Sequence, residues 1–149
     1  MKPLVGILMG SESDRETMNR TEEILTSLDI PYEVNVMSAH RNPEIVKEYS
    51  RTASERGLKV LIAGAGLAAH LAGAVASGTL LPVIGVPLDG GPLNGLDALL
   101  STVMMPKGIP VATVAIGSHG ARNAAYLAAQ IIALHDEKIL SALKAARGW

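Results

Sequence analysis

The chain contains no cysteine among its 149 residues. This absence excludes disulfide bonds, thiolate catalysis and metal centres held by cysteine, and it fits a reducing compartment. The most apolar region, residues 58–87, is interrupted by His70, several glycines and Pro82, so no run of about 20 apolar residues could cross a bilayer. Residues 1–3 lead directly into an apolar strand, which is unlike a signal peptide. We therefore expect a cytoplasmic protein with no membrane partner.

Aromatic residues and net charge are also scarce. The chain has no phenylalanine, three tyrosines and one tryptophan, and 13 basic against 14 acidic side chains leave a net charge of -1. A nucleic-acid-binding protein needs a basic surface and often stacking rings, and this sequence offers neither. The four histidines are scattered without the spacing of a metal site. We expect no nucleic-acid partner and no metal.

Apolar side chains are abundant instead. Hydrophobic residues make up 48% of the chain and the mean hydropathy is +0.29, which is high for a monomer and predicts apolar surface between subunits. The length suits one domain with a single core. We therefore expect residues 1–149 to form one domain that assembles into a homo-oligomer.

Short runs of Val, Ile and Leu alternate with longer segments of helical period, a pattern typical of a buried parallel sheet covered on both faces. This predicts a three-layer α/β/α, flavodoxin-like fold, because crossovers between parallel strands are right-handed. The predicted strands are residues 4–9, 32–36, 60–63, 83–86 and 111–116.

Helix signals separate these strands. Residues 13–16, Ser-Asp-Arg-Glu, have the pattern of a capping box, and Asn42-Pro43 predicts a helix that ends at Gly57. Further helices are expected from just after Gly66 to about residue 78, and over residues 96–104 and 122–135. Residues 136–149 predict a terminal helix that packs on a neighbouring subunit.

The first turn that could carry chemistry follows the first strand. Ser11 and Ser13 lie at a helix N-terminus, where hydroxyls and free N–H groups favour a phosphate, and Asp14 could accept hydrogen bonds from a ribose diol. The alternative is that Ser13 only caps the helix while Asp14 complements the helix dipole.

Two further turns follow the second and third strands. His40 and Arg41 could serve a proton transfer and a phosphate together, although a lone loop histidine is more often structural or solvated. Residues 64–66, Gly-Ala-Gly, fall short of the dinucleotide fingerprint but allow a flat heterocycle to approach the backbone. His70 is either a ligand of that ring or a histidine at a subunit contact. His119 and His135 are expected to be structural or solvated.

Several motifs in register carry a resemblance to a known family. They are Met-Gly-Ser-Glu-Ser-Asp at 9–14, Ser-Ala-His-Arg at 38–41, Ile-Ala-Gly-Ala-Gly at 62–66 and Ala-Ala-His-Leu at 68–71. The match continues through residues 82–87, 95–97, 105–111 and 123–125. With these motifs the chain resembles the N5-carboxyaminoimidazole ribonucleotide mutase family over nearly its whole length.

The resemblance implies an octamer and an enzyme of purine biosynthesis that needs neither metal nor organic cofactor. Its substrates would be an aminoimidazole ribonucleotide and CO2, and His40 would be the general acid and base. The residues implied to bind the phosphate are Ser11, Ser13, Ser38 and Arg41, with Ala39 beside them. Asp14 would bind the ribose, and the residues implied to bind the imidazole and carboxylate are Ala65, Gly66, His70 and Leu71.

Three residues depart from the family pattern. Leu67 stands where the family usually has the second glycine of a pair, Ala72 replaces a common proline, and Met104 replaces a common glutamine. These changes leave open a related carboxylase that uses free CO2 or another heterocyclic mononucleotide, and a nucleotide-binding module without catalysis. The Ala-Ala-His-Leu segment favours the mutase branch.

Overall fold

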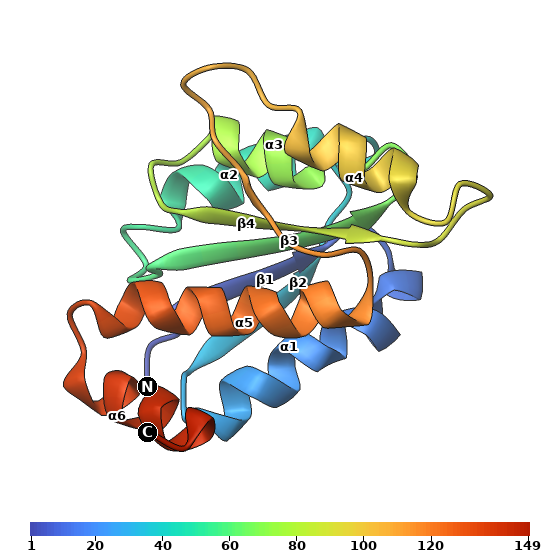
Figure 1. The fold of residues 1–149 in the computed structure, drawn as a ribbon. Coiled ribbons are helices and arrows are strands. Elements are labelled where there is room, and N and C mark those ends of the chain that lie inside the picture. Colours follow the sequence, from blue (N-terminus) through green and yellow to red (C-terminus); the bar gives the residue numbers. More distant parts are fainter.

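A computed structural model describes all residues, 1–149, and shows a five-stranded parallel sheet in the order β2-β1-β3-β4-β5. The strands are β1 (Val5–Met9), β2 (Tyr32–Val36), β3 (Val60–Gly66), β4 (Val83–Leu88) and β5 (Ala112–Thr113). This order is that of flavodoxin-like sheets, in which the chain reverses direction across the sheet between β1 and β3. The carboxyl ends of the strands point to the same side of the molecule (Figure 1).

Helices cover both faces of the sheet, which confirms the predicted three-layer α/β fold (Figure 1). The helices are α1 (Arg15–Ser27), α2 (Pro43–Thr52), α3 (Leu71–Ser77), α4 (Leu96–Val103), α5 (Ser118–Ala133) and α6 (Glu137–Arg147), with a short 3-10 helix η1 (Glu12–Asp14) before α1. Helices α1, α5 and α6 lie on one face, and α2, α3 and α4 lie on the other.

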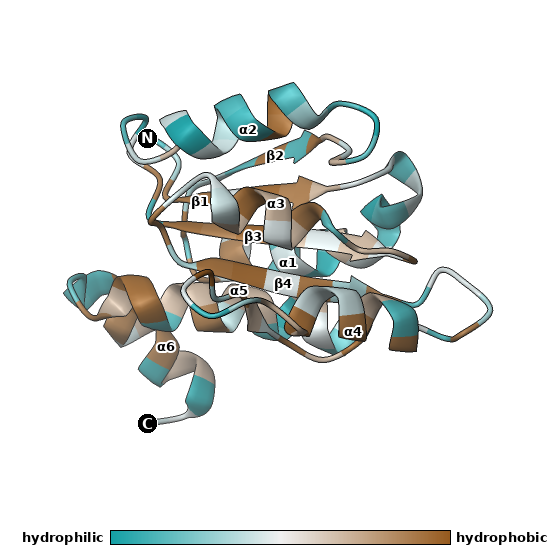
Figure 2. Cartoon of the chain, turned by 90° about the horizontal axis from the view of Figure 1, so that it is seen from above, coloured by the Kyte–Doolittle hydropathy of each residue, from teal (hydrophilic) through white to brown (hydrophobic).

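The alternation of side chains along the central strands explains the two cores. Ile7 and Ile62 belong to a buried cluster with α1 and α5, whereas Leu8 and Leu61, their neighbours in sequence, belong to a second cluster with α2 and α3. Successive side chains of a strand point to opposite faces, so an uninterrupted apolar strand serves both layers. Figure 2 shows the hydrophobic colours concentrated in the central strands and the hydrophilic colours on the outer side of α2.

The start of α1 differs from the prediction. The capping box is formed by Ser11 and Asp14 around η1, and the predicted box that starts at Ser13 is wrong. The Ser11 hydroxyl accepts a hydrogen bond from the Ser13 N–H, and the Asp14 carboxylate accepts one from the Ser11 N–H. The tight 3-10 turn therefore occupies the place where an α-helical first turn was expected.

Several further boundaries were wrong. Helix α2 ends at Thr52 rather than at Gly57. Helix α3 begins at Leu71 rather than just after Gly66, because Leu67 has a left-handed backbone with φ of 54° that cannot continue a helix. Strand β5 covers only 112–113 of the expected 111–116, because only these two residues pair with β4, at Ile84 and Gly85. Helix α5 begins at Ser118, four residues early, where Gly117 supplies a positive φ for the N-cap.

The C-terminal helix α6 packs within its own chain. Its Ile139 and Leu143 are buried in the cluster that contains α1 and α5, and the Asp136 side chain caps its N-terminus. Trp149, at the end of the chain, is 80% exposed. Contact of the outer face of α6 with a neighbouring subunit stays a prediction. None of the helices combines the length and the apolar character needed to span a membrane.

Candidate active site

An open cavity of about 460 Å³ lies at the carboxyl ends of β1, β2 and β3, and its volume suits a small-molecule ligand. The reversal of strand order between β1 and β3 opens this crevice, because the following loops diverge to opposite sides of the sheet. All eleven residues predicted for the site line it, namely Ser11, Ser13, Asp14, Ser38, Ala39, His40, Arg41, Ala65, Gly66, His70 and Leu71. The fold thus gathers three turns that are up to 60 residues apart in sequence.

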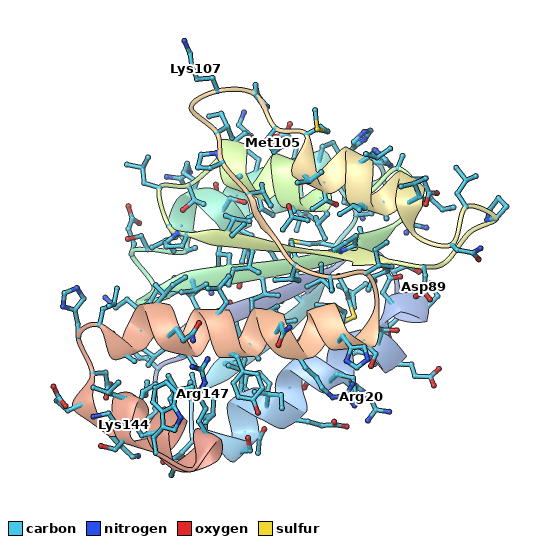
Figure 3. All side chains as sticks on the ribbon, viewed as in Figure 1. Arg20, Asp89, Met105, Lys107, Lys144 and Arg147 are labelled. Carbon is cyan, nitrogen blue, oxygen red and sulfur yellow. The ribbon has the colours of Figure 1, made fainter.

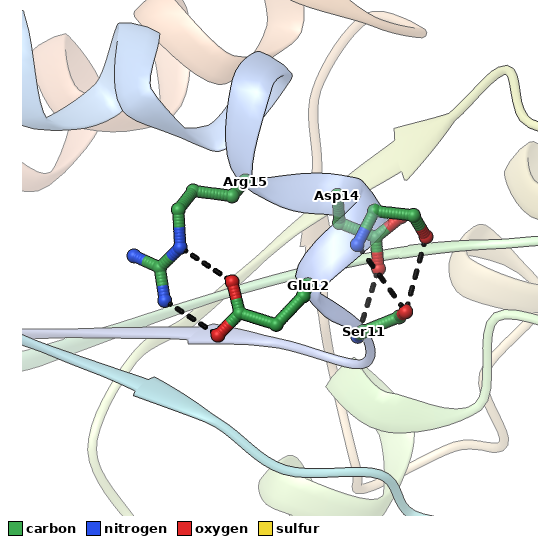
Figure 4. A network of polar contacts seen from close by, with 5 residues as sticks. Ser11, Glu12, Asp14 and Arg15 are labelled. Atoms are coloured by element: carbon green, nitrogen blue, oxygen red, sulfur yellow. Dashed lines mark hydrogen bonds and ion pairs between the residues drawn. The ribbon is translucent and has the colours of Figure 1, made fainter.

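The turn after β1 presents two hydroxyls beside a carboxylate (Figure 4). The Ser13 hydroxyl donates to the Ser11 hydroxyl at 3.0 Å, and Ser11 N–H donates to Asp14 Oδ2 at 3.1 Å. The Ser11 hydroxyl oxygen accepts from the Ser13 hydroxyl and from the Ser13 N–H, which leaves the Ser11 hydroxyl proton free to donate to an anion. Glu12 forms an exposed ion pair with Arg15 and takes no part in the hydrogen bonds among Ser11, Ser13 and Asp14.

The turn after β2 is fastened to the turn after β1. Arg41 Nη2 donates to the Gly10 carbonyl at 2.9 Å, and the Arg41 N–H donates to the Ser38 hydroxyl at 3.2 Å. Because the Ser38 oxygen acts as an acceptor here, its proton is also available to an anion. The combination of a guanidinium with donor hydroxyls from two strands is a chemistry suited to a phosphate group.

Asp14 lines the same part of the cavity, and its carboxyl group is half-buried. Burial raises the pKa of the Asp14 carboxyl above its usual value, and the Ser11 N–H and the Arg41 charge oppose the rise. Its Oδ2 atom is occupied by Ser11, which leaves Oδ1 able to accept hydrogen bonds from hydroxyls of a ligand.

Two histidines from different turns meet in the cavity. His40 Nε2 and His70 Nδ1 are 2.5 Å apart, and the ring planes are nearly perpendicular at 87° with centroids 4.7 Å apart. A hydrogen bond between two ring nitrogens needs one donor and one acceptor, so the protonation of one ring fixes the role of the other. The pair can therefore hold and pass a proton at one point of the cavity wall.

Four further residues line the cavity that the sequence did not single out as site residues: Gly10, Leu67, Ala68 and Gly90. Gly90 follows β4, whose carboxyl end lies at the same edge as the other three, so strand order would have been the signal for it. Leu67 was noticed only as a departure from a family pattern. His119 and His135 lie outside the cavity, and no cluster of three or more His, Asp or Glu side chains could hold a metal ion.

Comparison with known proteins finds relatives over nearly the whole chain. A family model for AIR carboxylase matches residues 4–148. The N5-carboxyaminoimidazole ribonucleotide mutase of Bacillus subtilis is 59% identical over 139 residues, which cover 93% of this chain and 86% of that protein. The mutase of Vibrio vulnificus is 56% identical over 143 residues, which cover 96% of this chain and 89% of that protein.

A solved structure of a PurE2 variant from Treponema denticola is similar to the whole fold. Its TM-score is 0.88 at 32% sequence identity, and the match covers 99% of this chain and 91% of that chain. The family match and the relatives each span most of the sequence. The chain belongs to the AIR carboxylase family.

Proposed function

We propose that this protein interconverts N5-carboxyaminoimidazole ribonucleotide and 4-carboxy-5-aminoimidazole ribonucleotide in purine biosynthesis. One observation carries the proposal: the cavity joins a set of anion donors, Ser11, Ser38 and Arg41, to the His40–His70 pair. The first group suits a nucleotide phosphate and the second suits proton transfer at a heterocycle. Relatives of this chain named as that mutase support the same assignment.

Each wall of the cavity has a role in this proposal. The phosphate accepts from the Ser11 and Ser38 hydroxyls, from Arg41, and from the Ser13 hydroxyl, which turns from Ser11 to the phosphate when the nucleotide binds. Asp14 Oδ1 accepts from the ribose hydroxyls. Ala39 contacts the nucleotide beside them. The imidazole and its carboxylate lie against Ala65, Gly66, His70 and Leu71, where small side chains let a flat ring approach the backbone.

The reaction needs one proton donor that later acts as a base. His40 protonates the carbamate nitrogen, the bond from that nitrogen to the carboxyl carbon breaks, and its electron pair stays on the nitrogen as CO2 leaves. The electron-rich C4 then attacks the enclosed CO2, and His40 removes the C4 proton so that the ring regains aromaticity. An imidazole suits both transfers, because one ring can act in turn as the acid that gives a proton and as the base that takes one.

His70 sets the starting state of His40 in this scheme. When His70 Nδ1 accepts, it holds the His40 Nε2–H in place; in its imidazolium form His40 can give a proton to the substrate, which leaves a neutral ring that can later take a proton back. Holding the ring and the freed CO2 together makes recapture an effectively intramolecular step.

The direct test is incubation of the purified protein with N5-carboxyaminoimidazole ribonucleotide, without ATP or metal. We expect the C4 carboxylate as product. His40→Asn should retain nucleotide binding and lose turnover by about 100-fold or more, the usual loss for a general acid–base residue. His119→Asn, outside the cavity, is the matched control. An inactive parent that still binds the nucleotide would instead support a binding module, and activity that needs added bicarbonate would support a carboxylase that uses free CO2.

We also propose a homo-octamer in the cytoplasm. The apolar composition and the exposed apolar side chains of α4, Leu96, Leu100 and Val103, support contact between subunits. Light scattering that gives a monomer mass at micromolar concentration would contradict the octamer.

A further inference from the structure

The side chain of Ser101, in α4, is hydrogen-bonded to the turn that carries His70. The Ala69 N–H donates to the Ser101 hydroxyl at 2.9 Å. Ala69 is buried, at 1% exposure, so solvent water cannot take the place of this acceptor. His70 is the next residue along the chain, and its ring forms the hydrogen bond with His40 in the cavity. Ser101 does not line the cavity, so its effect on the site passes through the turn.

The hydroxyl proton of Ser101 is used inside α4. It is donated to the Asp97 carbonyl, four residues earlier, at 2.8 Å, as is common for a serine within a helix. The carbonyl oxygens of Ala98 and Leu67 lie farther away, at 3.3 and 3.4 Å. Because the proton points along the helix, a lone pair of the hydroxyl oxygen faces the turn and can accept from Ala69. Helix α4 therefore orients the hydroxyl as an acceptor for the turn.

Helix α4 is a firm support for this hydroxyl. Thr102, the next residue, is 1% exposed, and a Cβ on Gly85 of β4 would overlap its methyl group, so α4 packs closely on the sheet. Met105, just after α4, lies next to α3 (Figure 3), where a Cβ on Gly73 would come within 3.1 Å of its sulfur. Close-packed contacts leave little freedom to shift. The position of Ser101 is therefore fixed by both β4 and α3.

The turn itself has no such support of its own. Residues 67–70 lie outside any helix or strand, and Leu67 has a left-handed backbone with φ of 54° that a leucine adopts only when its surroundings impose it. The His70 side chain forms no capping hydrogen bond with α3. The place of the His70 ring therefore depends on contacts between the turn backbone and neighbouring elements, and the hydrogen bond from Ala69 to Ser101 joins the turn to α4.

We propose that Ser101 is a positioning residue for the reaction: by holding the Ala69 N–H, it fixes the turn and so places the His70 ring against His40. This inference rests on the proposed function, in which His70 orients the histidine that transfers protons. The contact between His40 Nε2 and His70 Nδ1 is 2.5 Å long. Moving the His70 ring away by about 1 Å would stretch this contact beyond the ordinary hydrogen-bond range of about 2.7–3.2 Å, so the pair depends on an exact placement of the turn.

The test begins with the kinetics of Ser101→Ala, which leaves the buried Ala69 N–H without its acceptor. We expect kcat to fall by about 10- to 100-fold, the cost of a misplaced catalytic group, with a smaller change in KM because the phosphate is bound by the two other turns. Ser101→Thr keeps a hydroxyl that can bond the same helix carbonyl and should restore most of kcat. The control is Ser50→Ala, which removes a similar hydroxyl bond, to the Val46 carbonyl in α2, and should keep the kcat of the parent.

Two further measurements ask whether Ser101 acts through His70. Adding Ser101→Ala to His70→Asn should lower kcat little further, whereas a general structural role would lower it by the same factor in both backgrounds. NMR spectra of protein with ¹⁵N-labelled histidine give a readout that needs no turnover. Ser101→Ala should change the ring signals of His40 and His70 and leave those of His119 and His135, which lie outside the cavity, as in the parent.

The outcomes separate the two proposals. An active parent whose kcat is unchanged by Ser101→Ala, or lowered equally with and without His70, overturns the inference and leaves the proposed function standing. Unchanged ring signals of His40 and His70 overturn it as well, and they decide the matter if His70→Asn has no measurable turnover. If circular dichroism shows Ser101→Ala unfolded, Ser101→Cys, whose sulfur is a weaker acceptor, takes its place. A parent that yields no product overturns the proposed function, and the inference with it.

Discussion

The residues around Gly6 predict how much the substitution Gly6→Ala lowers the unfolding free energy. It lies in β1 and pairs with Glu33 on one side and Leu61 on the other. A Cβ on Gly6 would overlap the Tyr49 hydroxyl and come within 2.8 Å of Leu61 Cδ2. The Tyr49 hydroxyl donates to Glu33 Oε1 at 2.6 Å, and Glu33 also accepts from Arg56 at 2.7 Å. Gly6→Ala must therefore displace a tyrosine that is held by a charged hydrogen bond.

Two terms set the expected loss of unfolding free energy. Overpacking costs about 1–3 kcal/mol, and a weakened hydrogen bond to a carboxylate costs up to about 3 kcal/mol, so Gly6→Ala should destabilise by roughly 1–6 kcal/mol. At about 2–4 °C per kcal/mol for a domain of this size, Tm should fall by roughly 2–24 °C.

Urea unfolding of five proteins measures both the size of the destabilisation and its cause. These are the parent, Gly6→Ala, Tyr49→Phe and the double variant, with Gly90→Ala as the control because its Cβ would meet nothing within 4 Å. Tyr49→Phe removes the atom that the new methyl group meets, so Gly6→Ala should cost less in that background. The reasoning is refuted if Gly6→Ala lowers the unfolding free energy equally with Tyr49 and with Phe at position 49. It is also refuted if the loss in the parent is below about 0.5 kcal/mol, which is the range of ordinary surface substitutions.

Two further predictions concern the site. Burial raises the pKa of the Asp14 carboxyl in the folded protein above 3.8. The neutral carboxyl therefore adds to the unfolding free energy below pH 3.8, and this contribution is lost as the pH rises through the pKa of the folded state. Asp14→Asn should therefore melt at a higher temperature than the parent at pH 7, with the difference shrinking below pH 3.8, and should bind the ribonucleotide about 10-fold more weakly by calorimetry. Arg41→Ala should weaken ribonucleotide binding by roughly 10- to 100-fold, because charged hydrogen bonds to the phosphate are lost. The control is Arg51→Ala, which should leave binding unchanged, because the Arg51 guanidinium pairs with Glu48 on the surface. Equal losses of affinity in the two variants would contradict the phosphate assignment.

Much of the layer architecture could be predicted from the sequence because it depends on apolar periodicity. The runs at 4–9 and 60–63 are apolar at every position that must face a core, so five strands and their order along the chain followed directly. The gathering of the predicted site residues followed from one rule, that parallel strands end at one edge of the sheet. Their roles toward a ligand remain predictions.

The helix starts and the pairing of the two histidines could not be predicted, because they depend on the conformations of single residues, which composition and periodicity do not reveal. Ser11 rather than Ser13 caps the first helix because a 3-10 turn intervenes, and both serines satisfy the same sequence pattern. Helix α5 starts early because Gly117 takes a positive φ at its N-cap, and Gly120 lets the first turn pack closely on the Ala115 backbone. The pairing of His40 with His70 depends on the rotation of two side chains from separate turns, which sequence spacing cannot specify.

The hydrogen bond from Arg41 to the Gly10 carbonyl has a consequence for how fast a ligand can be captured. An arginine that must be ordered on arrival of its ligand loses up to about 2 kcal/mol of rotamer entropy, a factor of about 30 in affinity. Here folding has already restricted that side chain, and the guanidinium keeps further N–H groups that can reach an incoming anion. Ribonucleotide association should accordingly be a single-step process without a slow rearrangement phase, limited by encounter and sensitive to ionic strength.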